Sequence, residues 1–210
     1  MNIAVVGAAG TIGKRIAEEA LRRGHQVTAV VRSPDKLDDV KDKMNIVRAN
    51  AVDPSSVAEA VKGHDAVISA YGPRFGEEEE LLEAARALIE GVRRGGVKRL
   101  LIVGGAGSLI TDSGEALMDS AEFPRELWPL AKAHADAYGI YKECDLEWSY
   151  LSPASIIEPG RRTGQFRIGT DRLIMDESGA SRISVEDYAV AMLDELEDPQ
   201  FIGTRFTVAY

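Results

Sequence analysis

Cysteine is almost absent from this sequence, since Cys144 is the only one among 210 residues. One cysteine cannot form an intramolecular disulfide, so a disulfide-stabilised secreted scaffold is excluded and a reducing, cytoplasmic compartment is expected. Long apolar runs are absent too, and no segment reaches the roughly 18 apolar residues that a membrane span needs. The start, MNIAVVGAAG, lacks the basic residues and cleavage site of a signal peptide. We therefore expect no membrane partner.

Positive charge is also scarce, because 25 Lys and Arg face 34 Asp and Glu, which gives a formal net charge of −9. Such a surface repels a phosphate backbone, so no nucleic-acid partner is expected. A local pocket for one phosphate remains possible, because it needs only two or three basic side chains. The three histidines, His25, His64 and His134, share no metal-ligand spacing. We predict no metal site and expect structural or exposed roles for all three.

Short apolar runs alternate with helical patterns along most of the chain. The runs are Ile3–Val6, Val27–Val31, Ile46–Val47, Ala66–Ile68, Leu100–Val103 and Trp148–Leu151. Continuous apolar character is expected of strands buried on both faces of a parallel sheet. Between the runs, apolar residues recur at helical spacing, as over residues 81–92. The alternation predicts one α/β domain over residues 1–210, with a doubly wound parallel sheet and helices on both faces.

The alternation weakens from about Ile156. Residues 156–183 are expected to form loops with short extended pieces, as a small substrate-side lobe or lid over the strand ends. A helix that opens near Ser184 should follow, and then a final strand, Thr204–Ala209.

A glycine-rich segment, Gly7-Ala8-Ala9-Gly10-Thr11-Ile12-Gly13, lies between the first strand and the first helix. Gly7 allows a tight turn, Gly10 lets the backbone approach a pyrophosphate, and Gly13 lets helix and sheet pack closely. The helix N-terminus then presents free N–H groups to the anion. This placement predicts a Rossmann-like dinucleotide site. The alternative is a helix start that only needs flexibility.

The end of the second strand bears on the choice of dinucleotide. A site for NAD(H) would have Asp or Glu there to accept from the ribose 2′-hydroxyl. This sequence has Arg32 and Ser33, with Lys36 within reach. A guanidinium can bind a 2′-phosphate with two N–H groups, so NADP(H) is preferred over NAD(H). Arg32 could instead be an ordinary exposed arginine.

Five segments together carry a family resemblance. They are Gly7–Gly13, Val103–Leu109, Trp148–Ala154, Pro159–Gly164 and Ile183–Ala189. With them the chain resembles the atypical NAD(P)-binding branch of the short-chain dehydrogenase/reductase superfamily. Within that branch it looks like the NADH-flavin reductase group, which is related to biliverdin-IXβ/flavin reductases. The resemblance implies an NAD(P)H-dependent oxidoreductase that acts on a small-molecule substrate, for which a flavin is one candidate. It also implies a monomer or homodimer.

The resemblance also implies a set of site residues. Ser108 stands where the superfamily keeps its catalytic serine. Asn50 replaces an Asp that often contacts adenine, and Ser155 replaces a histidine of biliverdin-IXβ reductases, which puts bilin reduction in doubt. The implied cofactor-binding residues are Gly7, Ala9, Gly10, Thr11, Ile12, Gly13, Arg32, Ser33, Asn50, Ala51, Ala70, Tyr71, Gly72, Gly104, Gly105, Lys132, Pro153, Ala154 and Ser155.

The superfamily's proton-transfer pair, Tyr-x-x-x-Lys, has one match here, Tyr138 with Lys142. We interpret it as a decoy, because it lies near the end of its predicted helix rather than near the start. Lys132 is better spaced, but Trp128, four residues before it, has no acidic hydroxyl. Reduction of a ketone needs such a proton donor. Reduction of a flavin or a similar conjugated molecule needs less, because solvent can protonate the delocalised charge.

Two other functions stay open from the sequence. One is an NADP(H)-binding redox sensor without turnover. The other is an epimerase or ketone reductase that uses Tyr138 and Lys142. A positive cluster of Arg161, Arg162 and Arg167 could clamp an acidic substrate or a flavin phosphate, or could be a solvated loop.

Overall fold

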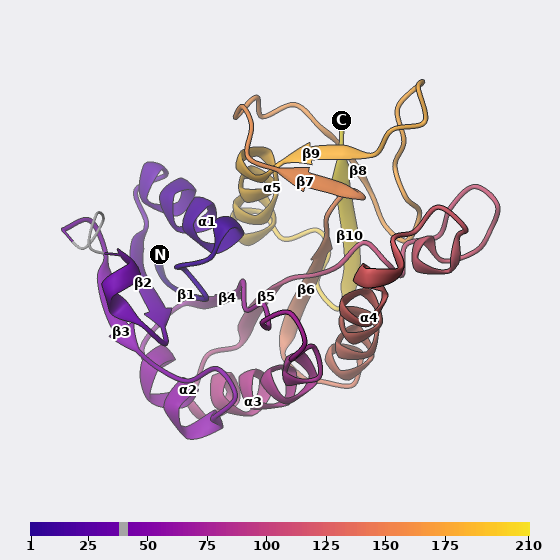
Figure 1. Cartoon of the computed structure of the whole chain (residues 1–210). Helices are drawn as coiled ribbons and strands as arrows, with labels where there is room; N and C mark the ends of the chain where they lie inside the picture. The colour runs from indigo at the N-terminus through magenta and orange to yellow at the C-terminus, as the bar shows by residue number, and fades with distance from the viewer. Residues whose placement is uncertain (38–41) are drawn as a thin grey trace.

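The computed structural model describes residues 1–37 and 42–210, and its centre is an eight-stranded sheet (Figure 1). The strand order is β3-β2-β1-β4-β5-β6-β10-β8, and every pairing is parallel except β10 with β8. The strands are β1 (Asn2–Val6), β2 (Gln26–Val31), β3 (Asn45–Arg48), β4 (Ala66–Ser69), β5 (Arg99–Val103), β6 (Glu147–Ser152), β8 (Arg167–Gly169) and β10 (Thr204–Ala209). The order reverses beside β1, as in a doubly wound sheet.

Helices cover both faces of the sheet (Figure 1). One face carries α1 (Thr11–Arg22) and α5 (Val185–Glu197). The other carries α2 (Pro54–Val61), α3 (Glu80–Arg94) and α4 (Trp128–Lys142). Short 3-10 turns occur at Pro34–Leu37, Leu117–Asp119 and Arg125–Leu127. The predicted α/β, doubly wound fold is confirmed.

Successive side chains of the central strands point to opposite faces and so join two separate cores. In β1, Ile3 and Val5 pack beneath α1 and α5, while Ala4 and Val6 pack beneath α2 and α3. This is why those strands are continuously apolar in sequence. One of the six predicted strands differs. Residues 46–47 were expected to be buried on both faces, but β3 lies at one edge of the sheet and these residues are only half-buried.

The C-terminal region contains the short extended pieces that were expected there. β7 (Ile156–Glu158) and β9 (Arg182–Ser184) form a separate two-stranded parallel sheet, and β8 extends the main sheet. Ser184 opens α5 as predicted, because its Oγ accepts a hydrogen bond of 3.0 Å from the N–H of Asp187. The final strand joins the main sheet beside β6.

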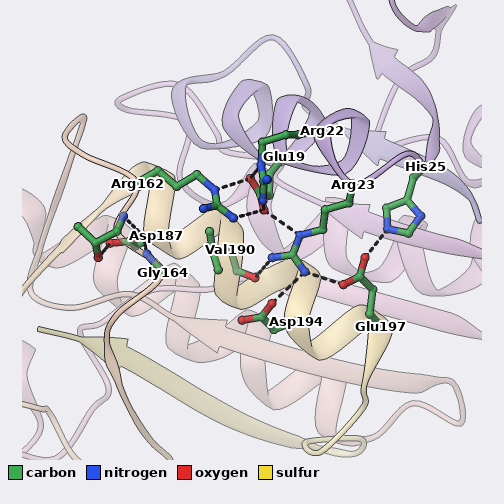
Figure 2. Close-up of polar contacts among 11 residues, drawn as sticks. Glu19, Arg22, Arg23, His25, Arg162, Gly164, Asp187, Val190, Asp194 and Glu197 are labelled. Carbon is green, nitrogen blue, oxygen red and sulfur yellow. Dashed lines mark hydrogen bonds and ion pairs between the residues drawn. The ribbon is translucent and has the colours of Figure 1, made fainter.

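Two buried carboxylates fasten the loop between β7 and β8 to the helices below it (Figure 2). Glu19 of α1 is 5% exposed and binds Arg22, Arg23 and the loop residue Arg162. Asp187 of α5 is fully buried, and its Oδ1 accepts from the N–H groups of Thr163 and Gly164 at 2.8 and 2.7 Å. The loop is therefore held from two sides, next to the strand ends.

Candidate functional site

A cavity of about 1090 Å³ runs along the carboxyl ends of the parallel strands. The segments that follow β1, β2, β3, β4, β5 and β6 all contribute to its wall. Ligands of doubly wound folds bind in this crevice, beside the point where strand order reverses. We call the part lined by segments after β1 to β4 the cofactor half, and the part lined by segments after β5 and β6 the acceptor half.

The glycine-rich turn has geometry that only glycine permits at two of its positions. Gly7 has φ +81°, and a Cβ there would lie 2.5 Å from the carbonyl oxygen of Ala70. A Cβ on Gly13 would lie 2.2 Å from the carbonyl oxygen of Gly7. Both distances are far inside van der Waals contact. The turn and the first helix therefore approach β1 and β4 as closely as the sequence pattern predicted.

The first turn of α1 opens into the cavity. Gly10 is its N-cap, no side chain in the described chain caps it, and the first turn has no acidic residue. The N–H groups of Thr11, Ile12 and Gly13 have no carbonyl one turn earlier in the helix to bond, and all three residues line the cavity. Free N–H groups and the helix dipole favour an anion here. This wall fits the pyrophosphate of a dinucleotide.

Two guanidinium groups line the cofactor half. Arg32 follows β2, is exposed, and makes no ion pair within the described part of the chain. Ser33 lies beside it, whereas the side chain of Lys36 is outside the described structure. Arg74, between β4 and α3, also lines the cavity and escaped the sequence analysis. The charge of Arg32 is therefore available to a ligand.

Tyr71 follows β4 and lines the same cavity, but its hydroxyl is already engaged. It donates a short hydrogen bond to a carboxylate oxygen of Glu80, at the start of α3. Burial, together with this bond, raises the pKa of Tyr71 above its usual value of 10.0. The hydroxyl is therefore poorly suited to donate a proton to a ligand.

Almost the whole set of expected cofactor residues lines this one cavity. Those that do are Gly7, Ala9, Gly10, Thr11, Ile12, Gly13, Arg32, Ser33, Asn50, Ala51, Ala70, Tyr71, Gly72, Gly104, Gly105, Pro153, Ala154 and Ser155. Lys132 does not, because its ammonium pairs with Asp136 at 2.5 Å on the same helix. Ser108 does not either: its Oγ accepts from Arg205 at 2.8 Å. The geometry gives these two expected roles no support.

Three glycines after β5 let α4 approach the acceptor half. A Cβ on Gly105 would lie 2.7 Å from the Cβ of His134, and one on Gly107 would lie 2.6 Å from the Cβ of Ala131. A Cβ on Gly104 would collide with the ring of Tyr150. The close packing brings one stripe of α4 to the cavity wall. Its members are Leu127, just before the helix, and Leu130, Ala131 and His134.

His134 is the one histidine in the described cavity wall, although the sequence suggested only a structural or exposed role. No hydrogen bond to its ring nitrogens occurs within the described residues. Burial lowers the pKa of His134 from 6.5 to about 4. The imidazole is thus neutral at pH 7 and can offer a hydrogen bond to a ligand without adding charge.

Tyr138 lies one turn beyond His134 on α4 and does not line the cavity. Its ring packs against Trp148 and Tyr150, and the guanidinium of Arg205 lies 4.9 Å from the ring centroid. Burial raises the pKa of Tyr138. The ammonium of Lys142 lies over the same ring at 5.6 Å. This packing agrees with the interpretation of the Tyr138–Lys142 match as a decoy.

The acceptor half ends in an apolar vestibule, which sequence reasoning missed. Its residues are Leu117, Phe123, Pro124, Leu127, Leu130, Ile156 and Ile157. In the sequence they resemble core residues, and only Ile156 and Ile157 fall in the predicted substrate-side segment. Of that segment, nothing beyond Ile157 lines the cavity among the described residues.

The expected arginine clamp is not part of the cavity. Arg162 is bound to Glu19, and Arg167 donates to the carbonyl oxygens of Met175 and Tyr210. Neither of these side chains nor that of Arg161 lines the wall. The geometry gives no support to the clamp alternative for Arg162 and Arg167, because acceptors within the protein bind both guanidinium groups.

Neither a candidate membrane span nor a candidate metal site occurs within the described residues. None of the helices there is long and apolar enough to cross a membrane. No group of three or more His, Cys, Asp or Glu within residues 1–37 and 42–210 is placed to hold a metal ion.

Comparisons with known proteins agree with this geometry. A model of a family described as NAD(P)H-binding matches residues 7–196. Three solved structures superpose over 100% of this chain. A candidate exported protein of Burkholderia pseudomallei is 48% identical, with TM-score 0.91 and 100% of that chain covered. A candidate epimerase of Bacteroides thetaiotaomicron is 44% identical, with TM-score 0.92 and 96% covered. A candidate NADH-flavin reductase of Streptococcus pneumoniae is 33% identical, with TM-score 0.88 and 99% covered.

Proposed function

The chain belongs to the NAD(P)H-binding family, and from that premise we propose that it is an NADPH-dependent oxidoreductase that reduces a flavin or a similar conjugated small molecule. Its resemblance to atypical short-chain dehydrogenases/reductases supports an NAD(P)H-binding oxidoreductase-like fold.

One observation carries the proposal. A single cavity joins an uncapped, glycine-rich helix N-terminus to an apolar vestibule whose α4 stripe holds no tyrosine. The only tyrosine in the described cavity wall is Tyr71, and its hydroxyl is bound to Glu80. The site therefore has the parts to hold a dinucleotide and a stacked acceptor, and lacks the Tyr–Lys proton donor that ketone reduction requires.

Bound NADPH would supply a hydride for N5 of the flavin ring, and solvent would supply the proton that neutralises the charge at N1, which would give NADP⁺ and reduced flavin. The protein's part in this chemistry is positioning. Thr11 to Gly13 would bind the pyrophosphate with their N–H groups, and Arg32 and Ser33 would bind the 2′-phosphate.

In the acceptor half, the backbone of Pro153 to Ser155 would border the nicotinamide. The side chain of Ser155 already donates to the carbonyl oxygen of Ser181 at 3.0 Å, which holds this segment in place. His134 can hydrogen-bond the acceptor or the nicotinamide amide as a neutral group.

Stopped-flow oxidation of NADPH with riboflavin tests the proposal. We expect turnover well above the protein-free rate, and turnover of Tyr138→Phe within about twofold of the unmodified protein, because Tyr138 lies outside the cavity. No turnover with riboflavin, FMN or menadione, an uncharged quinone, would reject the proposal. Tight NADPH binding without turnover would favour a redox sensor, and a large loss in Tyr138→Phe would favour the epimerase or ketone reductase.

A further inference from the structure

The two halves of the cavity differ in charge. Both arginines in the described wall, Arg32 and Arg74, belong to segments after β2 and β4, in the cofactor half. In the acceptor half, the one charged side chain of the described wall is the exposed carboxylate of Glu122. His134 also lines this half but is neutral. No Lys or Arg of the described chain lines that half.

The vestibule exposes apolar surface that a ligand would cover. Leu127 is 44% exposed and Ile156 is 39% exposed, and both are among the few large apolar side chains that the protein leaves open to solvent. Exposed apolar surface gathered at a cavity is typical of a ligand site. The cavity volume of about 1090 Å³ lies at the upper end of the ~300–1,000 Å³ range of ligand pockets.

A negatively charged substituent on the acceptor would find no cation there. The guanidinium groups of Arg162 and Arg167 are bound to acceptors within the protein, outside the cavity. The carboxylate of Glu122 makes no ion pair in the described structure, and the chain's net charge of −9 adds a general repulsion. Among the described residues that line the acceptor half, an anionic acceptor would therefore meet only the negative charge of Glu122.

We propose that the acceptor is an uncharged planar conjugated carbonyl compound, and that Glu122 disfavours acceptors that carry an anionic group. This inference rests on the proposed function and narrows its substrate class. Riboflavin has the required character. FMN has the same ring with an added phosphate, so the two differ in the feature that Glu122 would discriminate against.

The ratio of kcat/KM for riboflavin to that for FMN, measured with saturating NADPH, tests the inference. We expect a ratio of about ten at low salt, which falls as salt screens the exposed carboxylate. Glu122→Gln should lower the ratio about threefold, and Glu122→Lys should lower it further. Glu126→Gln is the matched control, because Glu126 is exposed, four residues away, and outside the cavity wall. It changes the net charge equally and should leave the ratio as it was.

The outcomes separate the inference from the function. FMN turned over as well as or better than riboflavin would overturn the inference and leave the flavin reductase proposal standing, as would equal effects of the Glu122 and Glu126 variants. Reduction of menadione, an uncharged quinone, without reduction of riboflavin or FMN would identify an acceptor that is not a flavin and would overturn the inference that Glu122 selects between the two flavins. No turnover with any of the three acceptors would overturn the proposed function and this inference with it.

Discussion

Replacement of Arg32 by Ala tests how the protein chooses its dinucleotide. Arg32 is exposed at the cavity wall and has no ion-pair partner in the described chain, so its loss leaves no buried group unpaired. Fold stability should stay the same. A hydrogen bond to a charged group contributes about 1.5–3 kcal/mol, and exposure to solvent places this one at the lower end. About 1.5 kcal/mol corresponds to a roughly tenfold weaker Kd for NADPH.

The assay is isothermal titration calorimetry with NADPH and with NADH. The variant should bind NADPH about tenfold more weakly and NADH almost unchanged, because only NADPH has a 2′-phosphate. Arg48→Ala is a matched control: Arg48 is an exposed arginine at the end of the neighbouring β3, outside the cavity wall. Equal losses for both dinucleotides, or a similar loss in the control, would refute the reasoning.

Three further predictions concern the glycine turn, the Glu19 cluster and His134. Gly13→Ala should destabilise the fold by about 2 kcal/mol in urea unfolding, because the new Cβ would meet the Gly7 carbonyl oxygen at 2.2 Å. Gly139→Ala is the control, because open space surrounds Gly139, and it should stabilise the fold by about 0.5–1 kcal/mol. Burial raises the pKa of Glu19, but its arginine partners outweigh burial and hold this pKa well below 4.5. The stability that the Glu19 carboxylate contributes is therefore present above about pH 4.5 and is lost as pH falls. Glu19→Gln should cost about 2 kcal/mol at pH 7 and little in acid, and unfolding curves across pH would measure this difference. The NMR signals of the His134 ring should titrate at about pH 4. The free energy of unfolding should fall as pH drops from 6.5 towards 4, because the unfolded chain then binds a proton that the folded chain does not. An NMR titration midpoint near pH 6.5 would contradict the burial argument.

The sheet and its cofactor half could be predicted because their signals are local. A strand buried on both faces must be apolar throughout, and a turn with positive φ and close approach to a neighbouring strand must use glycine. Both demands fall on consecutive residues, such as Ile3–Val6 and Gly7–Gly13, so they are visible in one sequence. Edge position is not local, which is why β3 was expected to be more buried than it is.

The acceptor half could not be predicted in the same way. Leu130 and His134 share a face of α4 with residues that pack into the core, and helical spacing alone does not say where core ends and cavity begins. Lys132 was well spaced but found a partner, Asp136, on its own helix. Ser108 occupies the expected place in the sequence, yet the fold brings Arg205 to it from 97 residues away.

Sequence alone therefore determined the layered fold, the strand-to-helix turn that can bind a pyrophosphate, and the presence of Arg32 beside it. Tertiary structure decided which side chains reach the cavity: it drew Arg162 to Glu19, 143 residues away, and left Glu122 as the only charge of the acceptor half in the described chain. The physical reason is that backbone conformation depends on neighbours in sequence, whereas the partner of a charged side chain depends on which distant segments the fold places within a few ångströms.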